Sequence, residues 1–236
     1  MGAATIVWHR TRRLAERLVV DRRLGISTAG HIPLVRLGLD HPERVSYEPS
    51  AWRTLRLVLD PDEVGHDDVF IDVGAGKGRV LLEAAAHYDF RRVIGVELSP
   101  ELAGVARANV EAMSQIRHDH IEVLVADATQ GVLPDDVTVI FLYNPFRGVL
   151  FDHFIETVVT SLDRCPRRVR IVYRSPFEHE RLMGTGRFRL LRQHYPARPT
   201  AGMRETGCVR LYETRCTSAA GQPPTTNPSE GASTSR

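Results

Sequence analysis

The strongest local signal in this sequence is Val69-Phe70-Ile71-Asp72-Val73-Gly74-Ala75-Gly76-Lys77-Gly78-Arg79. Its first five residues form a short apolar run, which predicts a strand that is buried on both faces. The glycines that follow predict a tight turn into a helix over residues 78–87, because glycine adopts backbone conformations that other residues avoid. Such a turn also lets the backbone pass close beneath a ligand. The stretch therefore predicts a ligand site between a strand and a helix.

The spacing of this glycine turn excludes two common nucleotide-binding patterns. A phosphate-binding loop requires a glycine where Ile71 stands, and a serine or threonine where Gly78 follows Lys77, the only lysine in the chain. A dinucleotide fingerprint requires a glycine at the position of Arg79. The observed pattern is G-x-G-x-G, preceded by Asp72. Because a carboxylate there attracts a charged amino group and repels a pyrophosphate, we expect a cofactor that carries an ammonium group.

Two further acids end the next predicted strands. Glu97 ends the strand over residues 92–97, about 20 residues after the turn, where an acid accepts hydrogen bonds from both hydroxyls of a ribose and disfavours a 2′-phosphate. Asp127, followed by Ala128, ends the third strand and is placed to accept a hydrogen bond from the exocyclic amine of adenine. The predicted cofactor-binding residues at this edge of the sheet are thus Asp72, Gly74, Ala75, Gly76, Gly78, Glu97, Asp127 and Ala128. An NAD-dependent reductase also uses an acid at the position of Glu97, so that class stays an alternative.

The order of predicted elements indicates an α/β fold. From residue 68 onward strands alternate with helices, which predicts a parallel sheet with helices on both faces. The last two strands have no helix between them and predict an antiparallel pair at the sheet edge. The fold class is therefore a Rossmann-like, doubly wound, mostly parallel seven-stranded sheet with an antiparallel terminal strand pair. The predicted strands are 69–73, 92–97, 121–126, 137–143, 169–174, 188–195 and 206–215, and the predicted helices are 50–59 (with Ser50 as its N-cap), 78–87, 100–113 and 149–162.

With these residues in place, the chain resembles the class I S-adenosylmethionine-dependent methyltransferases over residues 47–215. The resemblance rests on the Asp-x-Gly-x-Gly-x-Gly turn, on Glu97 and Asp127, and on the closing antiparallel pair. It implies S-adenosylmethionine as the cofactor, whose methionine part carries the ammonium group that Asp72 would bind.

A narrower resemblance involves Tyr47-Glu48-Pro49-Ser50 and Asn144-Pro145-Phe146. Both segments are similar to those of the seven-strand protein-lysine methyltransferases, which include nucleosomal histone-lysine enzymes and ATP synthase c-subunit lysine enzymes. The resemblance implies that Tyr47 folds over the methionine end of the cofactor and that Asn144, Pro145 and Phe146 are the catalytic residues. Apart from a short N-terminal arginine-rich helix, this sequence shows neither the basic extension of the histone enzymes nor the membrane anchor of the ATP synthase enzymes.

The acceptor is not fixed by these motifs. The triplet at 144–146 is one proline short of the Asn/Asp-Pro-Pro-Tyr/Phe motif of amino-methylating nucleic-acid enzymes, and it supports transfer to nitrogen. A protein lysine is the leading acceptor, followed by a small-molecule amine and then by an adenine in nucleic acid. A cofactor-binding regulator without catalysis is the non-enzymatic alternative. Multiplicity of methylation and oligomeric state are left open.

Composition and charge set wider bounds. The chain has 236 residues, 25% of them charged, and a net charge of +2, which is too small to indicate a nucleic-acid partner by itself. It holds no apolar run of the roughly 20 residues that would cross a membrane. His118 and His120 lack a third ligand at useful spacing, so no metal is expected. Three cysteines without a C-x-x-C pair favour a reduced, cytoplasmic location, with an organellar presequence as the alternative.

The predicted organisation has three parts. Residues 1–50 form an N-terminal helical and loop segment that covers the cofactor site, and it begins with an arginine-rich amphipathic helix over residues 5–20. Residues 51–216 form the methyltransferase domain. Residues 217–236 are predicted to be disordered, because Ser, Thr, Pro, Gly and Ala bury too little apolar surface to offset the entropy of ordering.

Overall fold

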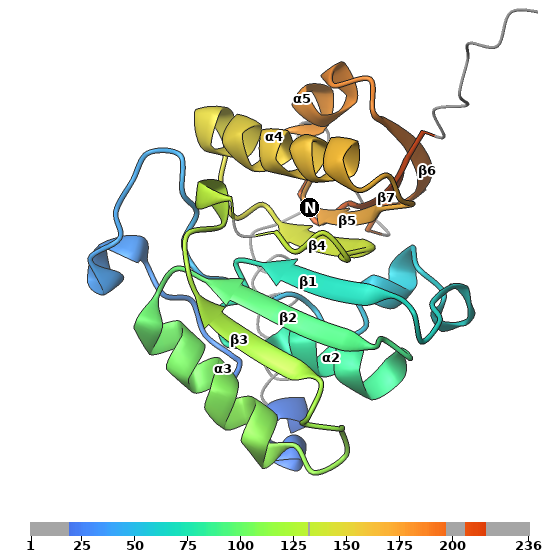
Figure 1. The fold of residues 1–236 in the computed structure, drawn as a ribbon. Coiled ribbons are helices and arrows are strands. Elements are labelled where there is room, and N and C mark those ends of the chain that lie inside the picture. The colour runs from blue at the N-terminus through green and yellow to red at the C-terminus, as the bar shows by residue number, and fades with distance from the viewer. Residues whose placement is uncertain (1–18, 132, 197–205, 216–236) are drawn as a thin grey trace, which may run out of the picture.

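A computed structural model describes residues 19–131, 133–196 and 206–215 of the chain. Its centre is a seven-stranded sheet of order β3-β2-β1-β4-β5-β7-β6, in which only β7 runs opposite to the others (Figure 1). The predicted fold class is confirmed, including the antiparallel pair at the edge. The strands are β1 (Val69–Val73), β2 (Arg92–Glu97), β3 (Ile121–Val125), β4 (Val139–Tyr143), β5 (Arg170–Arg174), β6 (Phe188–His194) and β7 (Val209–Thr214).

Helices cover both faces of the sheet. Helices α2 (Arg79–His87) and α3 (Pro100–Ala112) lie on one side, and α4 (Gly148–Arg164) and α5 (His179–Gly184) lie on the other (Figure 1). Strand β1 is buried along its whole length between these layers, as its apolar sequence predicted. The short helix α5 was not predicted, because six residues are too few to show a helical period. The apolar side of α4 packs on the sheet through Phe151, Phe154, Ile155, Val158 and Leu162.

The helix predicted over residues 50–59 is wrong. This segment contains only a 3-10 turn, Leu55–Leu57, and the positive φ of 64° at Arg53 interrupts any helix that would start at Ser50. The buried carboxylate of Glu83 on α2 accepts the backbone N–H groups of Thr54 at 3.1 Å and Leu55 at 2.9 Å. A side chain from a distant helix thus satisfies the amides that a local cap was expected to satisfy.

The N-terminal part is anchored by charged side chains. The described residues 19–24 are helical, while the rest of the helix predicted over residues 5–20 lies outside the described residues. The carboxylate of Asp21 accepts the N–H groups of Thr28 at 2.7 Å and Ala29 at 2.8 Å, and it pairs with Arg79 at 3.1 Å. The predicted tail over 217–236 also lies outside the described residues.

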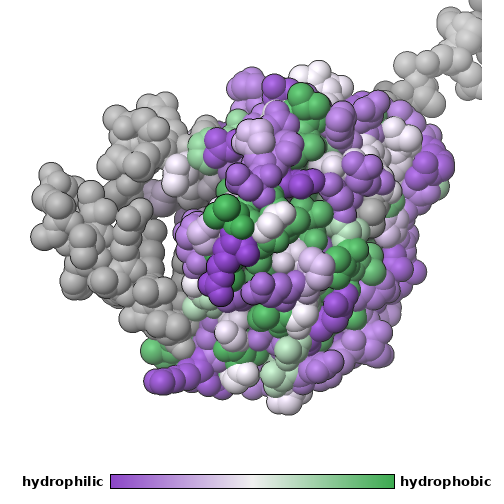
Figure 2. Space-filling view, turned by 90° about the vertical axis from the view of Figure 1, so that its left-hand side faces the viewer, coloured by the Kyte–Doolittle hydropathy of each residue, from purple (hydrophilic) through white to green (hydrophobic). Residues whose placement is uncertain are grey.

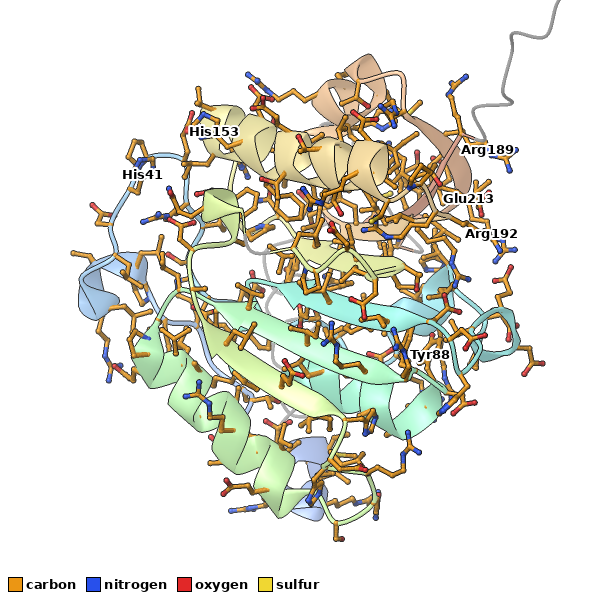
Figure 3. The ribbon with its side chains drawn as sticks, viewed as in Figure 1. His41, Tyr88, His153, Arg189, Arg192 and Glu213 are labelled. Carbon is orange, nitrogen blue, oxygen red and sulfur yellow. The ribbon has the colours of Figure 1, made fainter. Side chains whose placement is uncertain are left out.

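The outer strand of the sheet is protected by charge. Arg189 and Arg192 lie along β6 near Glu213 of β7 (Figure 3), and the Arg189 Nη2 lies 2.8 Å from the Glu213 Oε1. Charged side chains on an edge strand disfavour pairing with a further strand. Among the described residues, no helix has the length and apolarity needed to cross a membrane.

Candidate functional site

A pocket of about 310 Å³ lies at the carboxyl ends of the parallel strands. This is the edge where open α/β sheets bind their ligands. The face that contains it has apolar side chains in its middle and hydrophilic ones around them (Figure 2). Part of its lining comes from residues 31–50, here called the strap. Most of the rest comes from the glycine turn, from the ends of β1, β2 and β4 and from the segments after β2, β3, β4 and β5.

The pocket brings together most of the residues predicted from the sequence. Gly76 and Gly78 are the two predicted residues outside its lining. Gly78 instead precedes α2 and packs against Ala106 of α3. The predicted residues that line the pocket are Tyr47, Asp72, Gly74, Ala75, Glu97, Asp127, Ala128, Asn144, Pro145 and Phe146.

At two positions of the turn, Gly74 and Gly76, a side chain would collide with another part of the protein. A Cβ at Gly74, where φ is 77°, would lie 2.9 Å from the Pro145 Cβ. A Cβ at Gly76, where φ is 56°, would lie 2.3 Å from Cε2 of the Tyr47 ring. Each glycine therefore has both a backbone conformation and a contact that exclude a side chain. The turn joins the strap to the loop after β4.

Asp72 provides a buried acid in the wall of the pocket. It is 3% exposed, and its burial, with the nearby Glu97 and Glu83 carboxylates adding to the effect, raises the pKa of its carboxyl well above the usual range. An ammonium group in the pocket would stabilise the ionised form of this carboxyl. This environment fits the cation that the sequence predicted for Asp72.

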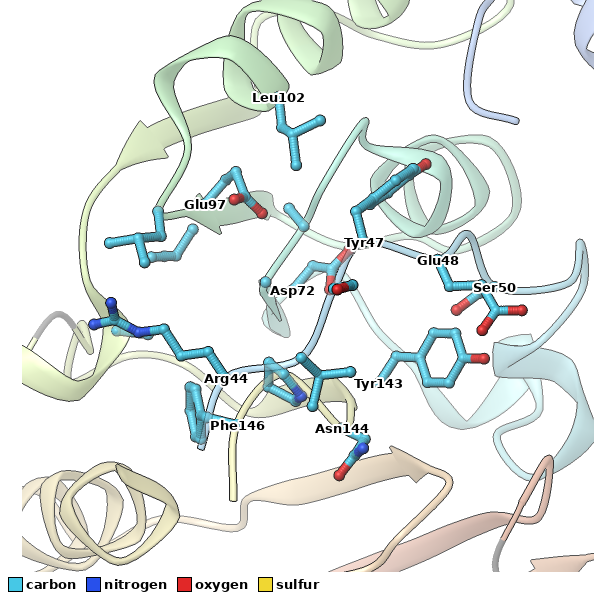
Figure 4. A pocket seen from close by; sticks show the side chains of 18 of the residues that line it. Arg44, Tyr47, Glu48, Ser50, Asp72, Glu97, Leu102, Tyr143, Asn144 and Phe146 are labelled. Atoms are coloured by element: carbon cyan, nitrogen blue, oxygen red, sulfur yellow. The ribbon is translucent and has the colours of Figure 1, made fainter. Parts of the chain in front are cut away.

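Glu97 is held in place by the backbone. Its Oε2 accepts the N–H of Gly76 at 2.8 Å, and its Oε1 accepts the N–H of Ser99 at 2.8 Å. Burial raises the pKa of this carboxyl, while the backbone bonds oppose the shift. Because each carboxylate oxygen can accept more than one hydrogen bond, both oxygens remain able to bind the hydroxyls of a ribose. Figure 4 shows Glu97 on the wall beside Leu102.

The carboxylate of Asp127, which also lines the pocket, has a hydrogen-bond partner and an ion-pair partner within the protein. Its Oδ1 accepts the N–H of Thr129 at 3.0 Å and its Oδ2 pairs with Nη2 of Arg44 at 2.7 Å. Arg44 belongs to the strap and was missed, because a single arginine in a loop-rich segment carries no sequence signal. The expected adenine contact of Asp127 must therefore share this carboxylate with Arg44.

The strap is fastened on both sides of the pocket. Glu43 accepts the N–H groups of Val149 at 3.0 Å and Leu150 at 3.2 Å in the first turn of α4, and these bonds lower the pKa of its carboxyl. On the opposite side, the hydroxyl of Tyr47 donates to the carbonyl of Thr28 at 2.6 Å, and burial raises the pKa of this phenol. The strap thus spans the pocket from α4 to the glycine turn.

The triplet after β4 forms the opposite wall. Asn144 is 4% exposed, its φ is 44°, and its Oδ1 is buried with no hydrogen-bond partner among the described residues. The carbonyl of Pro145 accepts the N–H of Val45 in the strap at 3.2 Å. Phe146 packs on Phe154 of α4 with ring centroids 5.5 Å apart and lies beside Arg44 (Figure 4).

Two basic residues of the turn have structural partners. Lys77 donates to the carbonyl of Ala29 at 3.0 Å, and its Nζ lies 5.5 Å from the Tyr47 ring centroid. Arg79 is 2% exposed and donates to Thr28 and to the carbonyl of Ser50. These contacts tie the last residues of the strap, and the segment just before the strap, to the glycine turn and the start of α2. In the described part of the chain, no three His, Cys, Asp or Glu side chains gather as a metal site would require.

Comparisons with known proteins find similarity to methyltransferases. Residues 70–168 match the family described as "Methyltransferase domain". A protein-lysine N-methyltransferase of Saccharolobus islandicus is 29% identical over 97 residues, which are 39% of this chain and 60% of the relative. A probable cobalt-precorrin-6B C(15)-methyltransferase (decarboxylating) of Methanothermobacter thermautotrophicus is 32% identical over 98 residues, which are 39% of this chain and 47% of that relative. The chain thus spans about half to three fifths of the length of these relatives.

A solved structure shares the fold. The precorrin-8W decarboxylase of Methanobacterium thermoautotrophicum superposes with a TM-score of 0.51 at 24% identity, covering 72% of this chain and 92% of that one. The overall likeness extends beyond the region that the sequence comparisons match.

Proposed function

Because this chain has the class I S-adenosylmethionine-dependent methyltransferase fold and a matching methyltransferase domain, we propose that it transfers a methyl group to the side-chain amine of a protein lysine. The observation that carries this proposal is Asn144, a residue that lines the pocket and whose buried Oδ1 has no hydrogen-bond partner among the described residues. A buried acceptor of this kind is completed by a donor, and an amine N–H is such a donor.

The donor set of the pocket fits S-adenosylmethionine, the cofactor of this family. Asp72 offers a buried carboxylate for the ammonium group, and Glu97 offers two oxygens for the ribose hydroxyls. Asp127 and Ala128 lie at the end where the adenine would be bound. When bound, this cofactor supplies a methyl group on a positively charged sulfur, which is the electrophile of the reaction.

The protein's part is to hold the acceptor and remove competing water. Asn144 Oδ1 accepts one N–H of the incoming amine and turns the nitrogen lone pair toward the pocket. The positive φ of Asn144 stores backbone strain at this position, as is common at functional sites. The strap covers the pocket and limits the access of solvent, which favours the neutral form of the amine.

Glu48 favours a cationic acceptor. This exposed residue of the strap lines the pocket, and Figure 4 places it near Tyr143 and Ser50, on the side away from Glu97. A carboxylate at the entrance attracts a lysine ammonium and gives no such advantage to a neutral adenine. The name of the Saccharolobus relative also supports a protein lysine. A small-molecule amine is the second candidate, since Glu48 would attract any cationic amine.

Labelling by the full-length chain tests this proposal. The protein is incubated with methyl-labelled S-adenosylmethionine and with the proteome and metabolites of its own organism, and labelled sites are identified by mass spectrometry. We expect label on protein lysines. The variant Asn144→Gly, which permits the positive φ but removes the amide, should lose labelling and keep cofactor affinity. Label confined to nucleic acid or to small molecules, or binding of NADH without S-adenosylmethionine, would contradict the proposal.

A further inference from the structure

Two arginines are stacked on aromatic rings where β4 and β5 end. Tyr143 and Arg174 are neighbours in the register of these two strands, and Arg174 Cζ lies 4.7 Å from the Tyr143 ring centroid. Further along the same two loops, Arg147 Cζ lies 4.2 Å from the Phe177 ring centroid. The first pair joins the last residues of β4 and β5, and the second pair joins the segments that follow them, so each guanidinium group is held against a ring.

Within residues 19–131, 133–196 and 206–215, no carboxylate pairs with the N–H edges of these two guanidinium groups. Among the described residues, neither Arg147 nor Arg174 forms an ion pair, whereas Arg44, Arg79 and Arg181 all do. The Nε of Arg174 is buried and lacks a hydrogen-bond partner in the described part of the chain. Stacking uses the face of a guanidinium and leaves its N–H edge free for a carboxylate in the same plane. Both groups are therefore prepared to bind an anion.

This position is the outer rim of the proposed acceptor site. Arg147, Phe177 and Ser175 line the pocket together with Asn144. Phe177 is 41% exposed, so the rim also presents apolar surface, and Val149, two residues after Arg147 in the chain, is 54% exposed. A cationic rim with exposed apolar side chains fits an acidic stretch of polypeptide better than it fits a small amine.

We propose that Arg147 and Arg174 recognise an acidic side chain next to the target lysine. The inference rests on the proposed lysine methylation and adds a sequence preference to it. Glu48 attracts the lysine ammonium, while the two arginines bind the carboxylate of a neighbouring aspartate or glutamate. The opposite charges of Glu48 and of the two arginines select a lysine with an acidic neighbour against a lysine in a basic segment.

Synthetic peptides provide the test. Each peptide has one central lysine in a neutral background, with glutamate or glutamine at one position from three residues before to three residues after the lysine. Methylation by the full chain is measured as kcat/KM. We expect at least one glutamate peptide to exceed its glutamine counterpart by about tenfold, the factor that one charge-assisted hydrogen bond supplies. Arg147→Gln and Arg174→Gln should each reduce this preference to about twofold, mainly through KM.

Two control variants separate recognition from folding. Arg117→Gln removes an exposed arginine at the opposite edge of the sheet and should keep the preference. Arg147→Lys keeps the charge but loses the planar edge, and we expect an intermediate preference. Equal rates for glutamate and glutamine peptides would overturn this inference and leave lysine methylation standing.

If no peptide is methylated, a binding measurement still tests whether the arginines recognise an acidic peptide. The glutamate peptides, with methionine in place of lysine, are titrated against the full chain in the presence of S-adenosylhomocysteine. Binding that is lost in Arg147→Gln would support the recognition of an acidic segment. The failure of the chain to methylate the lysine peptides would then contradict the proposed lysine methylation. Absence of binding, or stronger binding of an RNA oligomer through the same arginines, would overturn the inference.

Discussion

The ring of Tyr47 packs directly on the backbone of Gly76, so closely that a Cβ on the glycine would lie 2.3 Å from its Cε2. This contact joins the strap to the glycine turn. It also explains why Gly76 is outside the lining of the pocket although its N–H holds Glu97. Gly76 thus contacts both Tyr47 and Glu97, two residues that line the pocket.

A side chain at Gly76 should displace Tyr47 and weaken both folding and cofactor binding. The variant Gly76→Ala must adopt a φ of 56° and clears the ring only if the strap moves. We expect a loss of about 2–4 kcal/mol in the free energy of unfolding and a reduced affinity for S-adenosylmethionine. Denaturant titration and calorimetry measure the two effects.

The matched control and a double variant isolate the contact. Gly104→Ala places a Cβ on α3, where nothing lies within 4 Å, and should be neutral or stabilising. In Tyr47→Ala/Gly76→Ala the two effects should be less than additive by about 1 kcal/mol or more. Additive effects would show that the ring is not what excludes the side chain.

The ion pair of Arg44 with Asp127 should slow release of the cofactor. Both side chains are 23% exposed, so the pair is expected to contribute less than about 1 kcal/mol. In Arg44→Gln the dissociation rate of S-adenosylmethionine, measured by stopped flow, should rise about twofold to fivefold. Arg36→Gln, an exposed position of the same strap, serves as the control. A slower or unchanged release in Arg44→Gln would contradict a fastening role for this pair.

The ion pair of Asp21 with Arg79 should contribute strongly to stability. Their side chains are 6% and 2% exposed, so Asp21→Asn removes a buried carboxylate charge that pairs with the buried guanidinium of Arg79. We expect a loss of about 3 kcal/mol or more in the free energy of unfolding. The exposed pair of Asp163 with Arg187 gives the control, and Asp163→Asn should change stability by less than about 0.5 kcal/mol. Equal effects of the two variants would refute the anchoring role of Asp21.

Glu83 should make stability depend on pH. Burial raises the pKa of its carboxyl from 4.5 to about 7. Between these pH values the folded protein retains a proton that the unfolded chain has released, so stability falls as pH rises through this window and then levels off. Relative to Glu83→Gln, the wild type should lose about 3 kcal/mol between pH 4 and pH 8. A difference between the two proteins that does not change with pH would contradict this shift.

The sheet could be predicted from the sequence because apolar runs and the glycine turns that end them are local signals. Strand β1 and strand β2 have the predicted bounds, and Asp72, Glu97 and Asp127 lie at strand ends as the alternation of elements required. The reversed direction of β7 followed from the missing helix before it.

The strap was less predictable because its contacts join residues that are distant in the chain. Arg44 meets Asp127 across 83 positions, and Glu83 holds the amides of Thr54 and Leu55 from another helix. In residues 50–59 these long-range hydrogen bonds are present in place of the helix that Ser50 indicated as an N-cap. Nor does any local pattern show that Arg147 and Phe177 stack, since their loops meet only through the pairing of β4 and β5.

The most direct test of the account is a crystal structure of the full chain with S-adenosylhomocysteine. It should place the amino group of the ligand against Asp72 and the ribose hydroxyls against Glu97, beneath the strap. A nucleoside bound elsewhere, or these two carboxylates pointing away from it, would contradict the assignment of this pocket to the methyl donor.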